Sequence, residues 1–190
     1  TPHQSSAASD VYKRQDQATL DEIAAVATSL GCATHIDGAR IFNAAIATGV
    51  DVARMCQHYD SVSICFSKGL GAPVGSVLVG SSAFIAKAHR WRKLFGGGWR
   101  QAGLLASACL HALDHHVERL EEDHLRAKRI AAMLNDLPEF TVDLATVQTN
   151  MVYATTSRPA SEVVEQYAAN GIDMFDPVSY THLTLPTIGE

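Results

Sequence analysis

Hydrophobic and polar residues recur along most of the chain with the periods of helices and strands. Apolar positions at helical spacing predict helices over residues 19–30, 52–59, 82–95, 104–137 and 161–170. Short β-rich runs between them predict strands over residues 33–37, 61–66, 74–80, 149–154 and 172–175. The stretch 104–137 can form one bent helix or two, and Pro138 ends it. This order of elements predicts an α/β protein with a mainly parallel sheet.

The helix boundaries carry recognisable end signals. Thr19 and Glu22 have the spacing of a capping box at the start of the first helix, and Gly31 follows its last apolar position. Asp51 is placed to cap the second helix. These signals predict a firm first helix, followed by a strand that ends at Asp37.

The pattern of hydrophobic and polar residues also predicts how the chain divides into domains. Residues 16–137 are expected to form part of a large domain with a long connecting helix, and residues 138–176 an incomplete small α/β subdomain. Residues 1–15 and 177–190 lack periodicity and resemble translated adapter sequence, so we expect non-native or disordered tails. The last run, PVSYTHLTLPTIGE, is expected neither to complete a helix nor to pair with another strand. These features indicate a fragment of a longer protein.

Composition narrows the class of protein. The chain is 47% hydrophobic and 18% charged, with a mean hydropathy of +0.02. No apolar run approaches the ~20 residues that span a bilayer, so we expect a soluble globular protein. Fifteen Lys and Arg against twenty Asp and Glu give a net charge of −5, which disfavours nucleic acid and anionic membranes as partners. The four cysteines have no CxxC spacing, which favours reduced thiols and a cytoplasmic location.

Three residues suggest chemistry at the carboxyl ends of the predicted strands. Asp37 ends one strand, Arg40 follows it, and Lys68 lies on the Gly-rich loop 67–73 after the next strand. Open α/β sheets collect reactive groups at this edge, so we expect the three to converge. Each residue taken alone favours a structural ion pair at the surface, worth at most ~1 kcal/mol.

Together the three residues match the needs of pyridoxal 5'-phosphate (PLP). A lysine forms the Schiff base with this cofactor, and a carboxylate keeps its ring nitrogen protonated. Opposite charges ~4 Å apart at an effective dielectric constant of ~20 attract by about 4 kcal/mol, which is enough to hold the ring protonated at neutral pH. Asp37 and Lys68 are therefore candidate cofactor residues.

Three segments carry a family resemblance. THIDGARIFNAA, SICFSKGLGAPVGSVLVG and RWRKLFGGGWRQAG are similar in order and spacing to motifs of the low-specificity L-threonine aldolases. Those are PLP enzymes of the aspartate-aminotransferase-like fold, called fold type I. The resemblance implies that Lys68 is the catalytic, Schiff-base lysine and that Asp37 pairs with the pyridine nitrogen. It also implies that Arg40 lies beside the cofactor and the substrate.

The resemblance extends to three further cofactor-binding positions. Lys93 and Arg100 match basic positions that border the active site and reach the phosphate of a neighbouring subunit. Their alternative interpretation is a solvated basic helix end. Ser67 is expected to donate to the phosphate, although serine beside a turn is commonly a turn residue.

The implied reaction is cleavage of L-threonine and related β-hydroxy-α-amino acids to glycine and an aldehyde. Its catalytic base stays open: His35 shares a strand face with Asp37, but a packed histidine is the favoured interpretation. His115, His116 and His124 are interpreted as surface histidines, and no metal site is expected.

The resemblance covers only the middle of an aldolase. The phosphate cradle, the residue that stacks on the ring and the arginine that binds the substrate carboxylate match no part of this sequence. We therefore expect this polypeptide to bind PLP weakly or not at all and to be inactive alone, and the intact protein to be a homo-oligomer. Two rival hypotheses are another fold type I lyase or aminotransferase, and a non-catalytic chain that serves only for packing or assembly.

Overall fold

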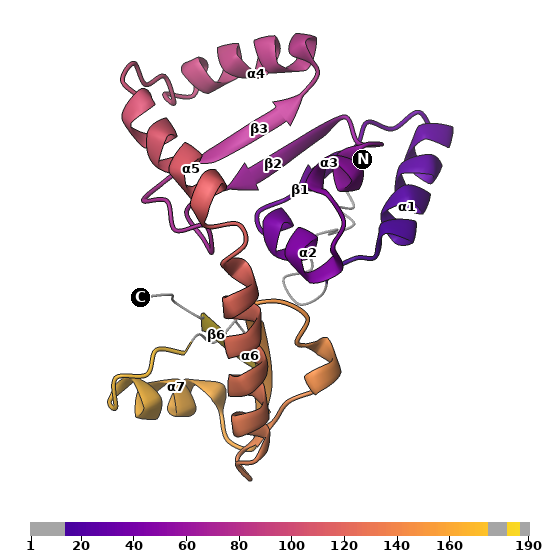
Figure 1. Cartoon of the computed structure of the whole chain (residues 1–190). Coiled ribbons are helices and arrows are strands. Elements are labelled where there is room, and N and C mark those ends of the chain that lie inside the picture. Colours follow the sequence, from indigo (N-terminus) through magenta and orange to yellow (C-terminus); the bar gives the residue numbers. More distant parts are fainter. Residues whose placement is uncertain (1–13, 175–181, 187–190) are drawn as a thin grey trace. The chain divides into compact units, whose positions relative to one another are not determined.

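The chain folds into two compact units. The computed structural model describes residues 14–174 and 182–186. The N-terminal unit is Gln15–Glu118, and the C-terminal unit comprises Arg14 and the described residues from Arg119 onward (Figure 1). The division falls between 118 and 119 and not at 137, because the helix over 120–135 packs with the C-terminal strands. The predicted tail 1–15 lies outside the described residues except for Arg14 and Gln15.

The N-terminal unit contains one three-stranded sheet. The strand order is β1-β2-β3, with β1 parallel to β2 and β2 antiparallel to β3. A parallel return needs a crossover of a dozen or more residues, which the short loop before β3 does not supply. The parallel character that the sequence predicted therefore applies to the β1–β2 pair. The elements are α1 (Gln17–Ser29), β1 (His35–Asp37), α2 (Ile41–Thr48), α3 (Val52–Cys56), β2 (Ser61–Cys65), β3 (Ser76–Gly80), α4 (Ser82–Leu94) and α5 (Gly103–His115).

The helix ends correct one sequence prediction and confirm two. The N-cap of α1 is Asp16, whose Oδ1 accepts from the Thr19 amide at 2.8 Å, so the predicted cap at Thr19 is wrong. Gly31 follows α1 with a φ of 64°, a left-handed conformation that glycine adopts without strain. Asp51 caps α3 as predicted, accepting from the Ala53 amide at 2.7 Å.

The sequence analysis missed helix α2. Its eight residues, IFNAAIAT, are largely apolar and show little polar contrast around the helix. Its N-cap position is Arg40, which makes no capping side-chain hydrogen bond, so the usual start signal is missing. The helix is defined by packing, since Ile41 and Asn43 are buried.

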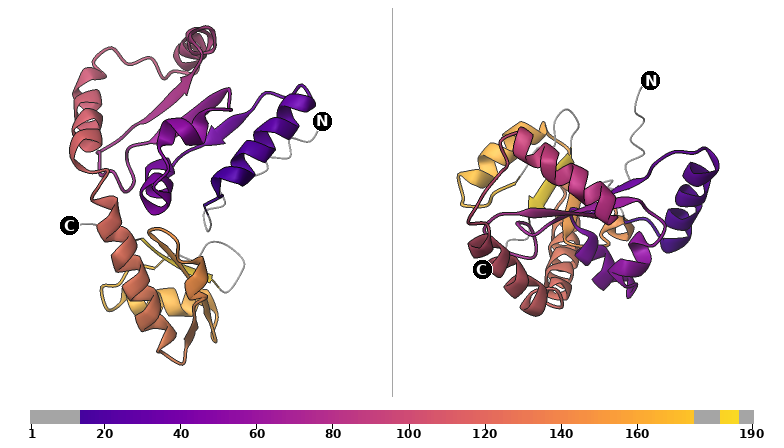
Figure 2. Two further views of the ribbon diagram at one scale, coloured as in Figure 1. Left: turned by 45° about the vertical axis from the view of Figure 1, so that its right-hand side comes forward. Right: turned by 90° about the horizontal axis from the view of Figure 1, so that it is seen from above.

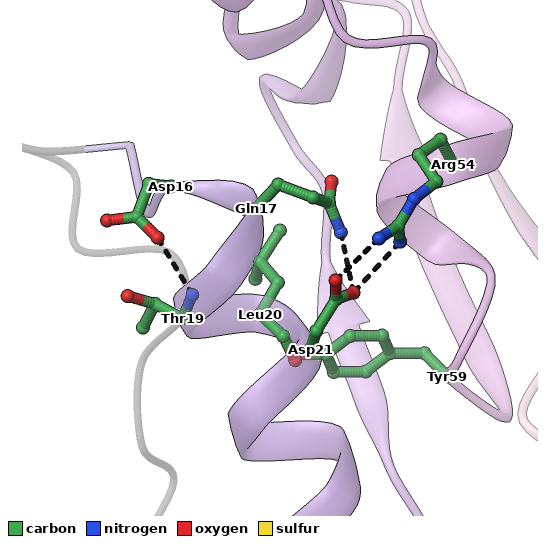
Figure 3. A network of polar contacts seen from close by, with 7 residues as sticks. All are labelled: Asp16, Gln17, Thr19, Leu20, Asp21, Arg54 and Tyr59. Atoms are coloured by element: carbon green, nitrogen blue, oxygen red, sulfur yellow. Dashed lines mark hydrogen bonds and ion pairs between the residues drawn. The ribbon is translucent and has the colours of Figure 1, made fainter.

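A polar network joins α1 to α3 (Figure 3). Both terminal nitrogens of Arg54 donate to the Asp21 carboxylate, at 2.9 and 2.5 Å, and Gln17 donates to the same carboxylate at 2.9 Å. The hydrogen bond from Arg54, and then the one from Gln17, lower the pKa of Asp21 to about 2. Tyr59, just before β2, donates its hydroxyl to the Leu20 carbonyl at 2.9 Å. These bonds attach the first helix to the segment that leads into the central strand.

The C-terminal unit contains a second, antiparallel sheet of order β4-β5-β6. The predicted strand over 172–175 is wrong for residues 172–174, which are irregular, and Phe175 lies outside the described residues. The third strand lies instead within 182–186 and pairs with β5. The expectation that the 177–190 run pairs with no strand is therefore wrong for those residues. The elements are α6 (Leu120–Asn135), β4 (Phe140–Thr141), η1 (Leu144–Thr146), β5 (Met151–Thr156), α7 (Ala160–Ala168) and β6 (His182–Pro186).

A continuous apolar core holds the C-terminal unit together. α6 packs along β5, and α7 adds its buried face (Figure 2). The long predicted helix is thus two helices, α5 and α6, of which only α6 belongs to this core. The buried residues are Ala127, Ala131, Leu134, Phe140, Val142, Val147, Val152, Ala154, Ala160, Val163 and Met174. No helix among the described residues has the length and apolar character needed to cross a membrane.

Candidate active site

Asp37 is placed by the tight junction between β1 and β2. It is the last residue of β1 and pairs in register with Ser63 of β2. The next residue, Gly38, is buried and donates its amide to the Ser63 carbonyl at 2.8 Å. A Cβ at Gly38 would lie 2.9 Å from that carbonyl oxygen, so only glycine allows this approach. The Asp37 carboxylate is solvent-exposed and accepts from the Ala39 amide at 3.2 Å.

Lys68 lies on the loop that connects β2 to β3. The loop is closed by the Phe66 amide, which donates to the Gly75 carbonyl at 2.9 Å, and by the Gly71 amide, which donates to the Lys68 carbonyl at 2.8 Å. Gly71 has a φ of 71°, which favours glycine at this turn. The Lys68 side chain is exposed, and its Nζ donates to Cys65 Sγ at 3.6 Å. The position of Lys68 on a loop between two strands agrees with the prediction from the sequence.

Asp37 and Lys68 lie toward the same face of the sheet. Side chains alternate between faces along a strand, so Asp37, its partner Ser63 and the following odd-numbered residue Cys65 share one face. The Lys68 amine reaches Cys65 on that face. The other face is apolar and buried, with Ile36, Val62 and Ile64. A carboxylate and an amine are therefore presented on the polar face of two neighbouring strands.

Arg40 brings a third charged group to the same strand end. It is half-buried at the N-cap position of α2, and its buried Nε has no hydrogen-bond partner among the described residues. A buried donor without a partner costs free energy comparable to a lost hydrogen bond. An anionic or polar ligand beside Arg40 would satisfy this nitrogen.

The other three candidates are less closely joined to this group. Ser67 is exposed next to Lys68, Lys93 lies in the last turn of α4, and Arg100 lies in the turn before α5. All three side chains are solvent-exposed. Within the part of the chain that the structure describes, no hydrogen bond or ion pair links them to Asp37, Arg40 or Lys68. Their predicted phosphate contacts stay predictions.

The histidines are arranged differently from the sequence interpretation. His35 is exposed and not packed, and its Nδ1 lies 2.9 Å from Ser61 Oγ on the face that carries Asp37. His124 is buried, at 5% exposure, so its interpretation as a surface histidine is wrong, and burial lowers its pKa. His115 is exposed as expected. The part of the chain with described coordinates holds no group of three residues suited to bind a metal.

His116 is the contact that the sequence analysis missed. It is half-buried at the end of α5, and its Nδ1 lies 2.7 Å from the Leu70 carbonyl in the Lys68 loop. The spacing of Cys109, Ala112 and Leu113 places His116 on the less exposed side of the helix. That spacing was the available signal, but the paired histidines suggested a solvated surface.

The donor set and the accessible face fit PLP. The cofactor needs an amine to hold its aldehyde carbon, an anion for its pyridinium nitrogen and cations or donors for its anionic groups. Lys68, Asp37 and Arg40 supply groups of these kinds at the ends of adjacent strands. A strand-end acid, a loop lysine and this α/β topology define the class of fold type I PLP-dependent enzymes.

Solved structures share the fold of this chain. The chain matches a putative L-allo-threonine aldolase from Listeria monocytogenes with a TM-score of 0.79 at 19% identity, over 94% of this chain and 52% of that one. A putative aromatic amino acid beta-eliminating lyase/threonine aldolase from Exiguobacterium matches with a TM-score of 0.75 at 23% identity, over 90% and 50%. A PLP-dependent aminotransferase from Streptococcus suis matches with a TM-score of 0.68 at 14% identity, over 92% and 48%. At these identities the likeness shows the fold.

Sequence comparison identifies the family. The beta-eliminating lyase family matches residues 14–157, so the chain belongs to that family of PLP-dependent lyases. A probable low-specificity L-threonine aldolase from Arabidopsis thaliana is 52% identical over 134 residues, which are 70% of this chain and 38% of that protein. The low specificity L-threonine aldolase of Escherichia coli K12 is 46% identical over 135 residues, 71% and 40% of the two chains. The chain spans about two fifths of the length of these relatives.

Proposed function

We propose that the chain is part of a PLP-dependent aldolase that cleaves L-threonine, L-allo-threonine and related β-hydroxy-α-amino acids to glycine and an aldehyde. The observation that carries the proposal is the placement of Asp37 and Lys68 on one sheet face, within the residues that match the family. The aldolase names of relatives 46–52% identical to this chain favour carbon-carbon bond cleavage over other PLP reactions.

The chain's residues take distinct roles in this proposal. When bound, PLP supplies an acceptor for the electron pair released as a bond to the substrate α-carbon breaks. Lys68 holds the cofactor covalently, and Asp37 provides the anion for the ring nitrogen. Arg40 uses its unpartnered Nε toward an oxygen of the cofactor or substrate. Ser67, Lys93 and Arg100 supply hydrogen bonds and positive charge to the phosphate, the last two across a subunit interface.

We also propose that the 190-residue chain alone binds PLP weakly and is inactive. Asp37, Ser67 and Lys68 are all solvent-exposed. Two unit charges ~4 Å apart attract by about 4 kcal/mol at a dielectric constant of ~20, but by only about 1 kcal/mol in bulk water. An open face therefore loses most of the electrostatic gain that a closed cleft would provide.

Reductive trapping tests the cofactor site. The purified chain is incubated with PLP, reduced with borohydride and digested, and the labelled lysine is located by mass spectrometry. We expect labelling that is substoichiometric, centred on Lys68 and abolished in Lys68→Ala, with Lys87→Ala as the matched control. Equal labelling of all exposed lysines would contradict the assignment of Lys68.

A longer chain, extended at both ends with the homologous segments of an L-threonine aldolase, tests the reaction. It should gain a PLP absorbance band that Lys68→Ala removes, and release glycine from threonine. Transamination or β-elimination without glycine release would instead establish the rival fold type I enzymes. Absence of the band would favour a non-catalytic packing module. Stable labelling of the 190-residue chain accompanied by aldol cleavage would contradict its proposed inactivity.

Two finer proposals concern the setting of the intact protein. We propose a homo-oligomer, since Lys93 and Arg100 are exposed and correspond to positions that would serve a neighbouring subunit. We propose the cytoplasm as its compartment, which is consistent with four free cysteines in the described structure. Sedimentation of the extended chain tests the first proposal, and fractionation of the source cells tests the second.

A further inference from the structure

The loop that carries Lys68 is supported by one side of helix α5. Cys109 Sγ lies 3.9 Å from the Val74 carbonyl, and His116 Nδ1 lies 2.7 Å from the Leu70 carbonyl. The two residues are seven positions apart, so they lie on the same side of the helix. The contact at Leu70 is the shorter and the closer to Lys68.

Backbone hydrogen bonds connect the turn that contains Leu70 to Lys68. The Gly71 amide donates to the Lys68 carbonyl at 2.8 Å, and the Ala72 amide donates to the Phe66 carbonyl at 3.0 Å. Leu70 lies inside this closed turn with a buried side chain, at 4% exposure. Fixing the Leu70 carbonyl therefore fixes the turn from which the Lys68 side chain projects.

The chemistry of the contact defines its direction. A carbonyl oxygen only accepts, so His116 must carry a proton on Nδ1 and donate it to Leu70. The ring also packs edge-on against His111, with centroids 5.3 Å apart. Among the described residues, His116 is the side chain that donates a hydrogen bond to the backbone of residues 67–73.

We propose that His116 is a positioning residue for Lys68, acting through the hydrogen bond from its Nδ1 to the Leu70 carbonyl. The proposal deepens the proposed function and rests on it where Lys68 serves as the cofactor-binding amine. The contact itself is independent of any cofactor, so it can be tested on the chain alone.

Two substitutions separate the hydrogen bond from ring packing. His116→Asn keeps a donor near the place of Nδ1 but loses the ring, whereas His116→Phe keeps a ring but loses the donor. His115→Phe is the matched control, because His115 is exposed on the same turn and, among the described residues, no hydrogen bond joins its side chain to the loop. Circular dichroism and an unfolding curve show that each variant is folded before the loop is compared.

Hydrogen exchange and proteolysis report directly on the loop. The amides of Gly71 and Ala72, which close the turn, should exchange roughly 3- to 10-fold faster in His116→Phe, as expected for the loss of one hydrogen bond. Trypsin cleavage after Lys68 should accelerate by a similar factor relative to cleavage after Lys128. In His116→Asn and His115→Phe both rates should stay within about twofold of the unaltered chain.

A cofactor readout links the loop to the proposed function. The initial rate at which PLP and cyanoborohydride label Lys68 should fall in His116→Phe and be retained in His116→Asn. If the extended chain forms no PLP adduct at Lys68, the proposed function fails, while exchange and proteolysis on the 190-residue chain still decide the role of His116.

Three results would overturn the positioning role. Loop rates unchanged in both His116 variants would show that the hydrogen bond holds nothing. Loosening in His116→Asn as great as in His116→Phe would assign the effect to the ring. Loosening in His116→Phe with unchanged labelling of Lys68 would confine His116 to a structural role.

Discussion

The two units of the chain differ in how their residues are buried. The C-terminal unit buries a continuous core between α6, α7 and its sheet, with Val152 and Val163 almost completely enclosed. The N-terminal unit leaves β3 and α4 without a single buried residue. The charged candidates Asp37 and Lys68 lie in the N-terminal unit. The continuous core and the candidate cofactor residues are therefore found in different units.

The difference follows from the physical demands on each unit. A core gains free energy by removing apolar groups from water, at roughly 25 cal/mol per Å². A site that receives a charged, flat ligand must instead expose polar groups at strand ends and loops. In the N-terminal unit the buried side of β1 and β2, with Ile36, Val62 and Ile64, lies behind the exposed groups.

The largest effect is expected for a substitution in the apolar core of the C-terminal unit. Phe140 is 4% exposed and packs against Tyr167 with ring centroids 5.8 Å apart, whereas Phe95 in the N-terminal unit is 81% exposed. Phe140→Ala should lower the free energy of unfolding of its unit by about 3–5 kcal/mol. Phe95→Ala should change stability by less than about 0.5 kcal/mol. Urea unfolding followed by circular dichroism measures both, and similar losses would remove the contrast between the units.

A smaller effect is expected at the junction that places Asp37. Gly38→Ala puts a Cβ 2.9 Å from the Ser63 carbonyl and 3.1 Å from Val62 Cγ1, so the strands must separate, at a cost of about 1–3 kcal/mol. Gly103→Ala is the matched control, since a Cβ there meets nothing within 4 Å and the position is helical. The control should be neutral or slightly stabilising. Exchange of the β2 amides distinguishes the two variants, and equal protection would contradict the close approach at Gly38.

The exposed helix α4 should depend on its cap and not on a core. Ser81 accepts from the Phe84 amide at 3.3 Å, and the helix has no buried residue. Ser81→Ala should cost about 1 kcal/mol, while Ser82→Ala, one position inside the helix, should cost little. Amide exchange within α4 measures this local loss. Equal effects of the two substitutions would show that the cap does not hold the helix start.

The smallest expected effect depends on pH and concerns the network of Figure 3. The pKa of Asp21 is lowered to about 2 in the folded chain, chiefly by its hydrogen bonds with Arg54. A lowered pKa means that the carboxylate stabilises the fold above its ordinary value of 3.8, and that this contribution is lost as the pH falls toward 2. Asp21→Asn should therefore flatten the acid limb of the stability curve of the N-terminal unit, only slightly because the pair is exposed to solvent. Glu22→Gln is the control, and an unchanged acid limb in Asp21→Asn would contradict the role of the ion pair.

Local patterns predicted much of the fold and the first elements of the site. Residues Ser61–Cys65 form a strand because they are β-rich, and the glycines around Lys68 exclude a regular element there. Asp37 was placed correctly at a strand end because the glycine after it signals a turn. These inferences depend on residues near one another in the sequence, where propensity and spacing are informative.

Features that depend on distant residues were not predicted. Helix α2 has no capping side chain, and it forms because tertiary packing buries Ile41. Nothing in the local sequence of residues 182–186 indicates that they pair with β5; the pairing becomes evident only in the structure. The bond from His116 to Leu70 joins positions 46 apart, so only the fold brings them together. The sequence predicted which elements carry Asp37 and Lys68 but not the long-range contacts that support those elements.

The bond from Gly38 to Ser63 has a consequence for how such a site can change. It sets the offset between two parallel strands next to the acidic side chain. Sliding one strand by a single residue would carry Asp37 to the apolar underside, away from Lys68. An insertion within either strand would shift this register and separate the acid from the amine, so the length of both strands is constrained by a single backbone hydrogen bond.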